Sequence, residues 1–228
     1  MFRRESDMVA AATAWMRGSG LHVKSEFVTP WGICDLVGLS FNANKVAERL
    51  RRRQTRPVSS ITRAALLLRI PDVAEQRSVT LARLVRQCAP AVPSEVVSAE
   101  IDRLIADRFV VRGRRGGLQK QNGWVPLHDR LVAIELKMSR VEEAMRQARN
   151  NLGFADESYI ALPADVARGV VAKAARYAQF FEAGVGLLAV THRRCEVVVP
   201  ARTTGTWKDA VIQFCCVEKF WRTRIRGS

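Results

Sequence analysis

The stretch that decides the fold is LVAIELKMSRVEEAMRQARNN, residues 131–151. It opens with four apolar residues, which predict a buried strand, and continues with apolar residues at helical spacing. A strand that leads directly into a helix is typical of α/β proteins. Glu135 and Lys137 lie two positions apart near the end of this strand, so their side chains project to the same face. The pair is either a surface ion pair of little energetic value or part of a functional site.

Strand and helix patterns of the same kind lie on both sides of a different middle segment. Towards the N-terminus, a helix is expected over residues 5–17, followed by a hairpin of two strands, LHVKSEFVTP and WGICDLVGLSF. Towards the C-terminus, the expected elements are strands at 157–163, 185–191 and 195–201, and helices at 140–151, 165–181 and from about 207. Together these patterns predict the α/β class, with a mixed central sheet flanked by helices.

The middle segment, residues 43–124, has its own pattern. Helices are expected at 44–56, 59–70, 80–89 and 93–108, and a basic hairpin follows the last of them. Three helices followed by a basic hairpin is the element order of a winged helix-turn-helix. We therefore expect residues 1–42 and 125–228 to form one α/β domain, into which residues 43–124 are inserted as a helical, winged-helix-like domain.

The charge of the chain points to a polyanionic partner. Lys and Arg total 37 against 22 Asp and Glu, which gives a formal net charge of +15 and an isoelectric point near 10.7. Such a field attracts polyanions, so nucleic acid is the expected partner, with DNA preferred and RNA not excluded. An anionic membrane surface is the alternative, but no apolar run is long enough to span a bilayer, and no membrane partner is expected.

The cysteines predict a reducing environment. The five cysteines are odd in number and scattered, with no CxxC pair, so neither a disulfide framework nor a structural zinc site is expected. The N-terminal MFRRESDMVA lacks the apolar core of a signal peptide. These features predict a cytoplasmic protein.

Two groups of basic residues in the middle segment are candidates for nucleic-acid phosphate contacts. The first lies in the expected helix at 44–56, and the second lies in and after the turn RGRRGG at 112–117. Their members are Arg49, Arg51, Arg52, Arg53, Arg56, Arg112, Arg114, Arg115 and Lys120. The alternative interpretation of such a run is a solvated helix face.

Asp35 is the second candidate acid of a site that includes Glu135. It lies in the otherwise apolar strand GICDLVGL, where an isolated carboxylate is costly without a partner. If this strand lies beside that of Glu135, two carboxylates and the Lys137 ammonium converge. Mg²⁺ prefers oxygen ligands and is commonly held by one or two carboxylates together with a substrate phosphate. The alternative for Asp35 is a turn or helix-cap carboxylate, and Glu26 is another candidate acid.

These residues resemble the motif of the PD-(D/E)XK nuclease superfamily. The resemblance covers residues 1–41 and 128–200, with WGICDLVG and IELK as the motif strands and Cys34 at a position where the family often has proline. It implies a restriction-endonuclease-like core, in which Asp35 and Glu135 are metal ligands and Lys137 is the catalytic lysine.

Two further residues enter through the same resemblance. It implies that Glu5, on the first helix, is an auxiliary acid and metal ligand. It also implies that Gln147, in RQARNN on the helix after the E-x-K strand, assists the substrate or the active site.

The resemblance implies a Mg²⁺- or Mn²⁺-dependent DNA endonuclease whose inserted basic domain grips DNA. Because each chain would carry one active site, cutting both strands of a duplex would suit a homodimer. Two alternatives stay open, a catalytically inactive nucleic-acid-binding protein of the same fold and an RNA-directed nuclease.

Overall fold

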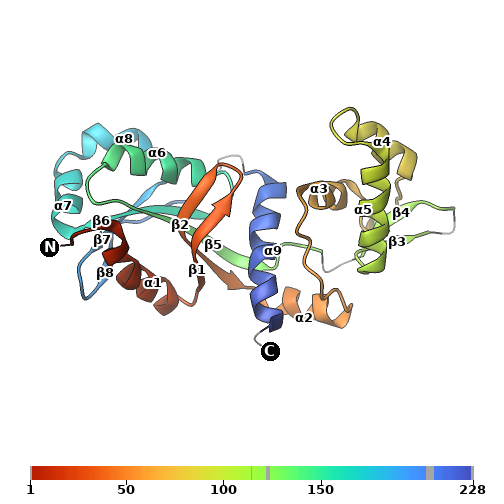
Figure 1. Cartoon of the computed structure of the whole chain (residues 1–228), viewed down its shortest axis with the longest axis horizontal. Coiled ribbons are helices and arrows are strands. Elements are labelled where there is room, and N and C mark those ends of the chain that lie inside the picture. Colours follow the sequence, from red (N-terminus) through yellow and green to blue (C-terminus); the bar gives the residue numbers. More distant parts are fainter. Residues whose placement is uncertain (1, 114, 122–123, 204–207, 227–228) are drawn as a thin grey trace. The chain divides into compact units, whose positions relative to one another are not determined.

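The computed structural model describes residues 2–113, 115–121, 124–203 and 208–226, the last five without their side chains. The chain divides into two compact units (Figure 1). The first unit consists of residues 1–40 and 128–213, and the second consists of residues 41–127 together with the chain from residue 214. Each unit is thus assembled from segments far apart in the sequence.

The first unit is built on a mixed six-stranded sheet with the strand order β1-β2-β5-β6-β7-β8. Strands β1 and β2 form an antiparallel hairpin, β5, β6 and β7 are parallel to one another, and β8 is antiparallel to β7. Their bounds are β1 His22–Thr29, β2 Gly32–Phe41, β5 His128–Leu136, β6 Glu157–Pro163, β7 Gly186–Val190 and β8 Cys195–Val199. The α/β class and the mixed central sheet are therefore confirmed.

Helices cover both faces of this sheet, which explains why its central strands are apolar on both sides. The 3-10 helix η1 (Glu5–Met8) and α1 (Val9–Gly18) cover one face, where Met8 and Met16 pack against Val132 and Ile134. The other face is covered by α6 (Val141–Asn151), α7 (Ala164–Ala172) and α8 (Ala174–Glu182) (Figure 1). Successive residues of a strand point to opposite faces, so β6 contributes Tyr159 and Ala161 to one core and Ile160 and Leu162 to the other.

Two expected helices differ from the structure in length. The helix expected at 165–181 is two helices, α7 and α8, because the backbone leaves helical geometry at Lys173, with φ −116° and ψ 32°. The helix expected at 44–56 is α2 (Ala43–Arg51) and ends earlier, because Arg53 adopts a positive φ of 56°. A left-handed residue cannot continue a right-handed helix.

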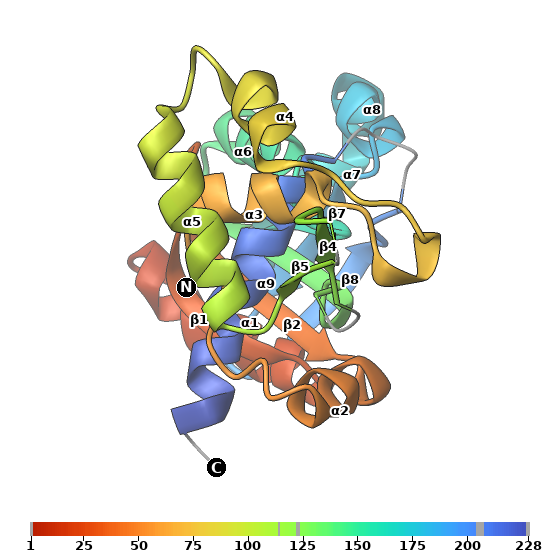
Figure 2. The ribbon, with the colours of Figure 1, turned by 90° about the vertical axis from the view of Figure 1, so that its right-hand side faces the viewer.

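The second unit contains a cluster of helices and a short two-stranded antiparallel sheet. Its N-terminal part consists of α2, α3 (Ile61–Arg69), η2 (Val73–Glu75), α4 (Leu81–Cys88), α5 (Ser94–Ala106), β3 (Val110–Arg112) and β4 (Leu118–Lys120). The residues Asn42, Ser60 and Thr80 begin α2, α3 and α4, since each side chain accepts a hydrogen bond from the backbone three positions on. Helix α5 packs against both α3 and α4 (Figure 2).

The C-terminal helix α9 (Ala210–Arg226) begins in the first unit and contributes to the core of the second. Its Glu218 accepts hydrogen bonds from both terminal nitrogens of Arg49 and, at 2.7 Å, from the backbone N–H of Val58. The indole of Trp221 donates to the carbonyl of Thr55 at 2.9 Å. Residues from 214 onward therefore belong with the middle segment, whereas the sequence placed them in the second part of the α/β domain.

No helix in the described ranges is long and apolar enough to cross a membrane.

Candidate active site

The candidate site lies at the carboxyl end of β5, a strand in the interior of the sheet. Residues Leu131 to Ile134 are fully buried, as a strand covered on both faces requires. The next residue, Glu135, is charged, and the strand ends one residue later at Leu136. In open α/β sheets, ligands bind beyond the carboxyl ends of the parallel strands, which makes this end of β5 the expected place for a site.

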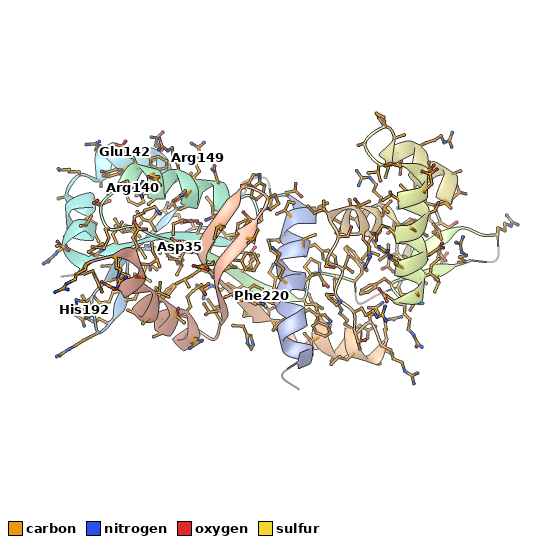
Figure 3. The ribbon with its side chains drawn as sticks, in the orientation of Figure 1. Asp35, Arg140, Glu142, Arg149, His192 and Phe220 are labelled. Atoms are coloured by element: carbon orange, nitrogen blue, oxygen red, sulfur yellow. The ribbon has the colours of Figure 1, made fainter. Side chains whose placement is uncertain are left out.

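Asp35 on β2 lies directly beside this end of β5, as the sequence predicted. Its Oδ2 accepts a hydrogen bond of 2.7 Å from the backbone N–H of Leu136, a residue 101 positions away in the chain. Figure 3 shows the position of Asp35 within the sheet of the first unit. The hydrogen bond holds the carboxylate of Asp35 against Leu136, the residue between Glu135 and Lys137 in the sequence.

Glu135 is almost completely buried, with 3% of its surface exposed. Burial raises its pKa, a hydrogen bond from Asn151 opposes this rise, and the nearby Asp35 carboxylate adds to it. Asn151, at the end of α6, donates from Nδ2 to Glu135 Oε1 at 2.7 Å. This hydrogen bond to one of the two carboxylate oxygens orients the Glu135 side chain.

Asp35 has a raised pKa as well. Burial is the largest cause, whereas the hydrogen bond from the Leu136 N–H and the charge of Lys137 lower the pKa. The charges of Glu5 and Glu26 raise it further. A buried and a half-buried carboxylate that each resist ionisation form an electrostatic arrangement typical of catalytic and metal-binding sites.

Lys137 and Glu5 complete the group. The Lys137 ammonium lies 3.6 Å from Glu5 Oε2, and the lysine is buried with 8% exposed. The other oxygen of Glu5 accepts a hydrogen bond from the Met138 N–H at 3.4 Å. Glu5 therefore reaches the site from η1 through Lys137. Glu26 is exposed on β1 and influences Asp35 only through its charge.

Helix α6 supplies two polar side chains on one face. Gln147 and Asn151 lie four positions apart, so they are neighbours along the helix. The side-chain oxygen of Gln147 is buried and accepts no hydrogen bond in the described part of the protein. Asn151, which contacts Glu135 directly, was not among the residues predicted from the sequence. The sequence did contain a signal for it, because Asn151 lies four residues after Gln147 and therefore on the same face of the expected helix.

Cys34 also lies in this group without a chemical role of its own. Its sulfur is 3.5 Å from Asn151 Nδ2 and 3.5 Å from the carbonyl of Ile134. Burial and the neighbouring Glu135 raise its pKa well above the usual range of a thiol. A thiol that stays protonated is a poor nucleophile, so Cys34 is a packing residue.

The donor set fits a hard divalent cation with few protein ligands. Across the described residues, no three Asp, Glu, His or Cys side chains lie close enough together to hold a metal ion. Asp35 and Glu135 are a two-carboxylate set, which is the number that magnesium commonly takes from a protein when phosphate and water supply the rest. A divalent cation would also offset the repulsion that raises the pKa of both carboxyls.

The residues predicted to contact nucleic acid fall into different environments. Arg51 and Arg52 both pair with Glu48 at 2.5 Å. Arg56 pairs with Asp107 at 3.6 Å, Arg112 pairs with Asp102 at 3.2 Å, and Arg53 and Arg115 are exposed. Arg114 lies outside the described residues. The guanidinium groups described here, except that of Arg49, reach the surface of the second unit.

Arg49 and Lys120 are buried, contrary to a role as surface contacts. Arg49 has no exposed surface, and its guanidinium lies over the rings of Trp221 and Phe109, at 4.5 and 5.1 Å from their centroids. With Glu218 satisfying its charge, Arg49 holds the core of the second unit together and offers nothing to a phosphate. Lys120 is 7% exposed, and its ammonium lies 3.9 Å from the centroid of the Trp124 ring.

Comparisons with known proteins leave the function open. No protein-family model matches the chain, and no curated protein matches it. Among solved structures, a protein of unknown function from Silicibacter pomeroyi is similar over 100% of this chain and 90% of its own length, with 13% sequence identity and a TM-score of 0.44. A similarity at this level carries no conclusion about fold or activity.

Proposed function

We propose that the protein is a metal-dependent DNA endonuclease with a PD-(D/E)XK-type site on a restriction-endonuclease-like core. The observation that supports it is the convergence of Asp35 and Glu135 from neighbouring strands, with Lys137 directly after the end of β5. Two carboxylates and a lysine are the residue types that metal-assisted phosphodiester hydrolysis uses.

Each residue of the site has a distinct part in this proposal. Asp35 and Glu135 would hold Mg²⁺ or Mn²⁺, which when bound supplies Lewis-acid stabilisation of the scissile phosphate. Lys137 orients the attacking water and balances the negative charge that develops at phosphorus. Glu5 positions the Lys137 ammonium at 3.6 Å, and Asn151 positions the Glu135 carboxylate at 2.7 Å.

The argument for a role of Gln147 rests on its buried side-chain oxygen. A buried amide oxygen without a hydrogen-bond donor is costly, and such groups in native proteins call for an explanation. A donor supplied by the substrate or by an ordered water would satisfy it, which supports the role of Gln147 beside the site.

The second unit would grip DNA as a winged-helix-type module. The order α3, α4, α5 and the β3–β4 hairpin supports this interpretation. The exposed arginines Arg53, Arg56, Arg112 and Arg115 would contact phosphates, because Arg forms bidentate, charge-assisted hydrogen bonds with them.

The experiment is a cleavage assay on plasmid, linear and branched DNA and on RNA, with Mg²⁺, Mn²⁺ or EDTA. We expect cleavage that requires the metal and is reduced at least ~100-fold by Asp35→Asn, Glu135→Gln or Lys137→Met, the scale of losing a preorganised catalytic group. Glu142→Gln is the matched control, because Glu142 lies on α6 with a side chain 56% exposed and outside the site (Figure 3).

The outcomes separate the alternatives. Cleavage that persists in the three site variants would refute this site. Tight binding without cleavage of any substrate, with either metal, would support the catalytically inactive binding protein. Cleavage confined to RNA would assign the protein to the RNA-directed nucleases.

A further inference from the structure

The second unit contains a basic pocket that the proposed active site does not use. It has a volume of about 310 Å³ and lies where the end of α3, η2, α4 and β4 meet. Four of its lining residues are cationic, Arg69, Arg77, Arg83 and Lys120, and Glu75 is the acidic one among those described. Four positive charges against one negative leave a formal excess of three, so the pocket is suited to an anion.

Lys120 is the buried charge of this pocket. Only 7% of the residue is exposed, and its ammonium lies over the Trp124 ring at 3.9 Å. Burial lowers its pKa, and the charges of Asp72 and Glu75 only partly offset that effect. Lys120 forms no ion pair within the described part of the chain. A buried ammonium is costly without a paired anion, and a ligand that supplies one would stabilise it.

The arginines at the mouth of the pocket are available to a ligand. Arg69 and Arg83 are exposed and form no ion pair with any described residue, although Arg69 donates to the Ala65 carbonyl at 3.1 Å. Arg77 pairs with Glu75 at 2.5 Å, and the other oxygen of Glu75 accepts from the Asp72 N–H at 2.8 Å. The Glu75 carboxylate is thus already paired, and the pocket keeps its formal excess of positive charge.

We propose that this pocket binds a phosphomonoester, the terminal phosphate of a nucleic-acid strand. A terminal phosphate carries close to two negative charges and three acceptor oxygens, which match an arginine pair and a lysine. The pocket is concave, a shape that suits the free end of a strand. The volume is at the lower end of that of small-ligand sites and accommodates one terminal nucleotide.

The phosphate site stands on residues of the second unit, and only its assignment to a strand end rests on the proposed action on nucleic acid. It is therefore tested by binding in EDTA, without any cleavage. Fluorescence anisotropy compares one labelled oligonucleotide with a 5′-phosphate, a 3′-phosphate or hydroxyls at both ends. AMP and inorganic phosphate serve as competitors.

We expect the wild type to bind a phosphorylated end about tenfold more tightly than the hydroxyl ends, the scale of one charge-assisted bidentate contact. Arg83→Ala and Arg69→Ala should abolish this preference. Arg86→Ala is the matched control, because Arg86 is exposed on the same helix α4, has the same charge and does not line the pocket. It should reduce binding to all three oligonucleotides equally and retain the preference.

Equal affinity for all three oligonucleotides, or equal behaviour of the Arg83 and Arg86 variants, would overturn the proposal. If AMP competes as tightly as the phosphorylated oligonucleotide, the ligand is a free nucleotide and the strand-end assignment is refuted. A Glu135→Gln protein that keeps the preference while lacking cleavage would separate this site from the catalytic one.

Discussion

Glu135 and Asp35 lie on neighbouring strands in surroundings that oppose their ionisation. Burial raises the pKa of both carboxyls, and repulsion from Asp35 adds to the rise at Glu135. A folded-state pKa above the unfolded value means that the ionised form costs stability at neutral pH, and this cost disappears as the pH falls through the folded and then the unfolded pKa. A functional site tolerates such a cost, whereas a stabilising ion pair would have the opposite sign.

The first prediction follows from the cost to stability of the ionised Glu135 carboxylate at neutral pH. In EDTA at neutral pH, Glu135→Gln should increase the free energy of unfolding by about 1 kcal/mol. The amide keeps an oxygen that accepts the Asn151 hydrogen bond but removes the buried charge. Thermal denaturation of wild type, Glu135→Gln and the control Glu142→Gln measures it. A loss of stability would mean that Glu135 is a structural ion-pair residue.

The second prediction concerns Asn151. Since Asn151 holds one oxygen of Glu135, Asn151→Ala should lower kcat about 10- to 100-fold, the usual effect of losing a residue that orients a metal ligand. Affinity for DNA measured in EDTA should not change. Asn150→Ala, an exposed neighbour on α6, is the control. An equal effect of both variants would remove Asn151 from the site.

The third prediction is a pH dependence at Asp156, outside the site. Burial raises the pKa of this carboxyl, but contacts from His128, Lys208 and the Leu131 N–H outweigh burial and lower it well below its usual range. A depressed carboxyl pKa adds stability above the unfolded pKa of about 3.9, and this stability is lost as the pH falls through the folded pKa.

Asp156→Asn should therefore destabilise the protein at pH 7 by about 1–3 kcal/mol, and the difference from wild type should shrink between about pH 5 and pH 2. Urea unfolding at a series of pH values measures this. Asp102→Asn, with its side chain 70% exposed, should show no such trend. A difference that grows on acidification would contradict the assignment.

At the scale of elements, α9 depends on a buried ion pair with α2. Arg49 and Glu218 have side chains 0% and 1% exposed, so removing either leaves the other buried and uncompensated. We predict that Glu218→Leu alone costs about 3–5 kcal/mol, whereas Arg49→Met combined with Glu218→Leu costs less than the sum of the single changes. A double-mutant cycle by urea denaturation tests this, and additive losses would show that the pair does not couple.

Elements were the level at which the sequence was most informative. Period-2 and period-3.6 patterns report which residues of a segment share a face, so strands and helices such as β5, β6 and α6 lie close to their predicted positions. The patterns do not report local backbone breaks, and the sequence therefore missed the break at Lys173. Arg49 was misplaced for a related reason, since a run of arginines does not reveal which one is opposed by a distant Glu218.

For the whole molecule, α9 determines how a variant that lacks the middle segment should behave. Removing residues 41–127 alone leaves Phe214, Val217, Phe220 and Trp221 of α9 without the core in which they are buried. We predict that the variant lacking residues 41–127 aggregates, because these apolar side chains of α9 would be exposed as one patch. A version with a short Gly/Ser linker in place of 41–127 that also ends at Gln213 should not aggregate. Size-exclusion chromatography distinguishes the two, and identical behaviour would contradict the role of α9.

The spacing of residues along the chain was enough to predict the α/β class and the strand-to-helix step at residues 131–151. These are local properties, since they depend on the spacing of residues along one element. Only the tertiary structure decided that Asp35 bonds Leu136, that Asn151 holds Glu135 and that Arg49 is buried against Glu218. Those contacts join residues from 16 to 169 positions apart, and no local pattern specifies which distant partner a face will meet.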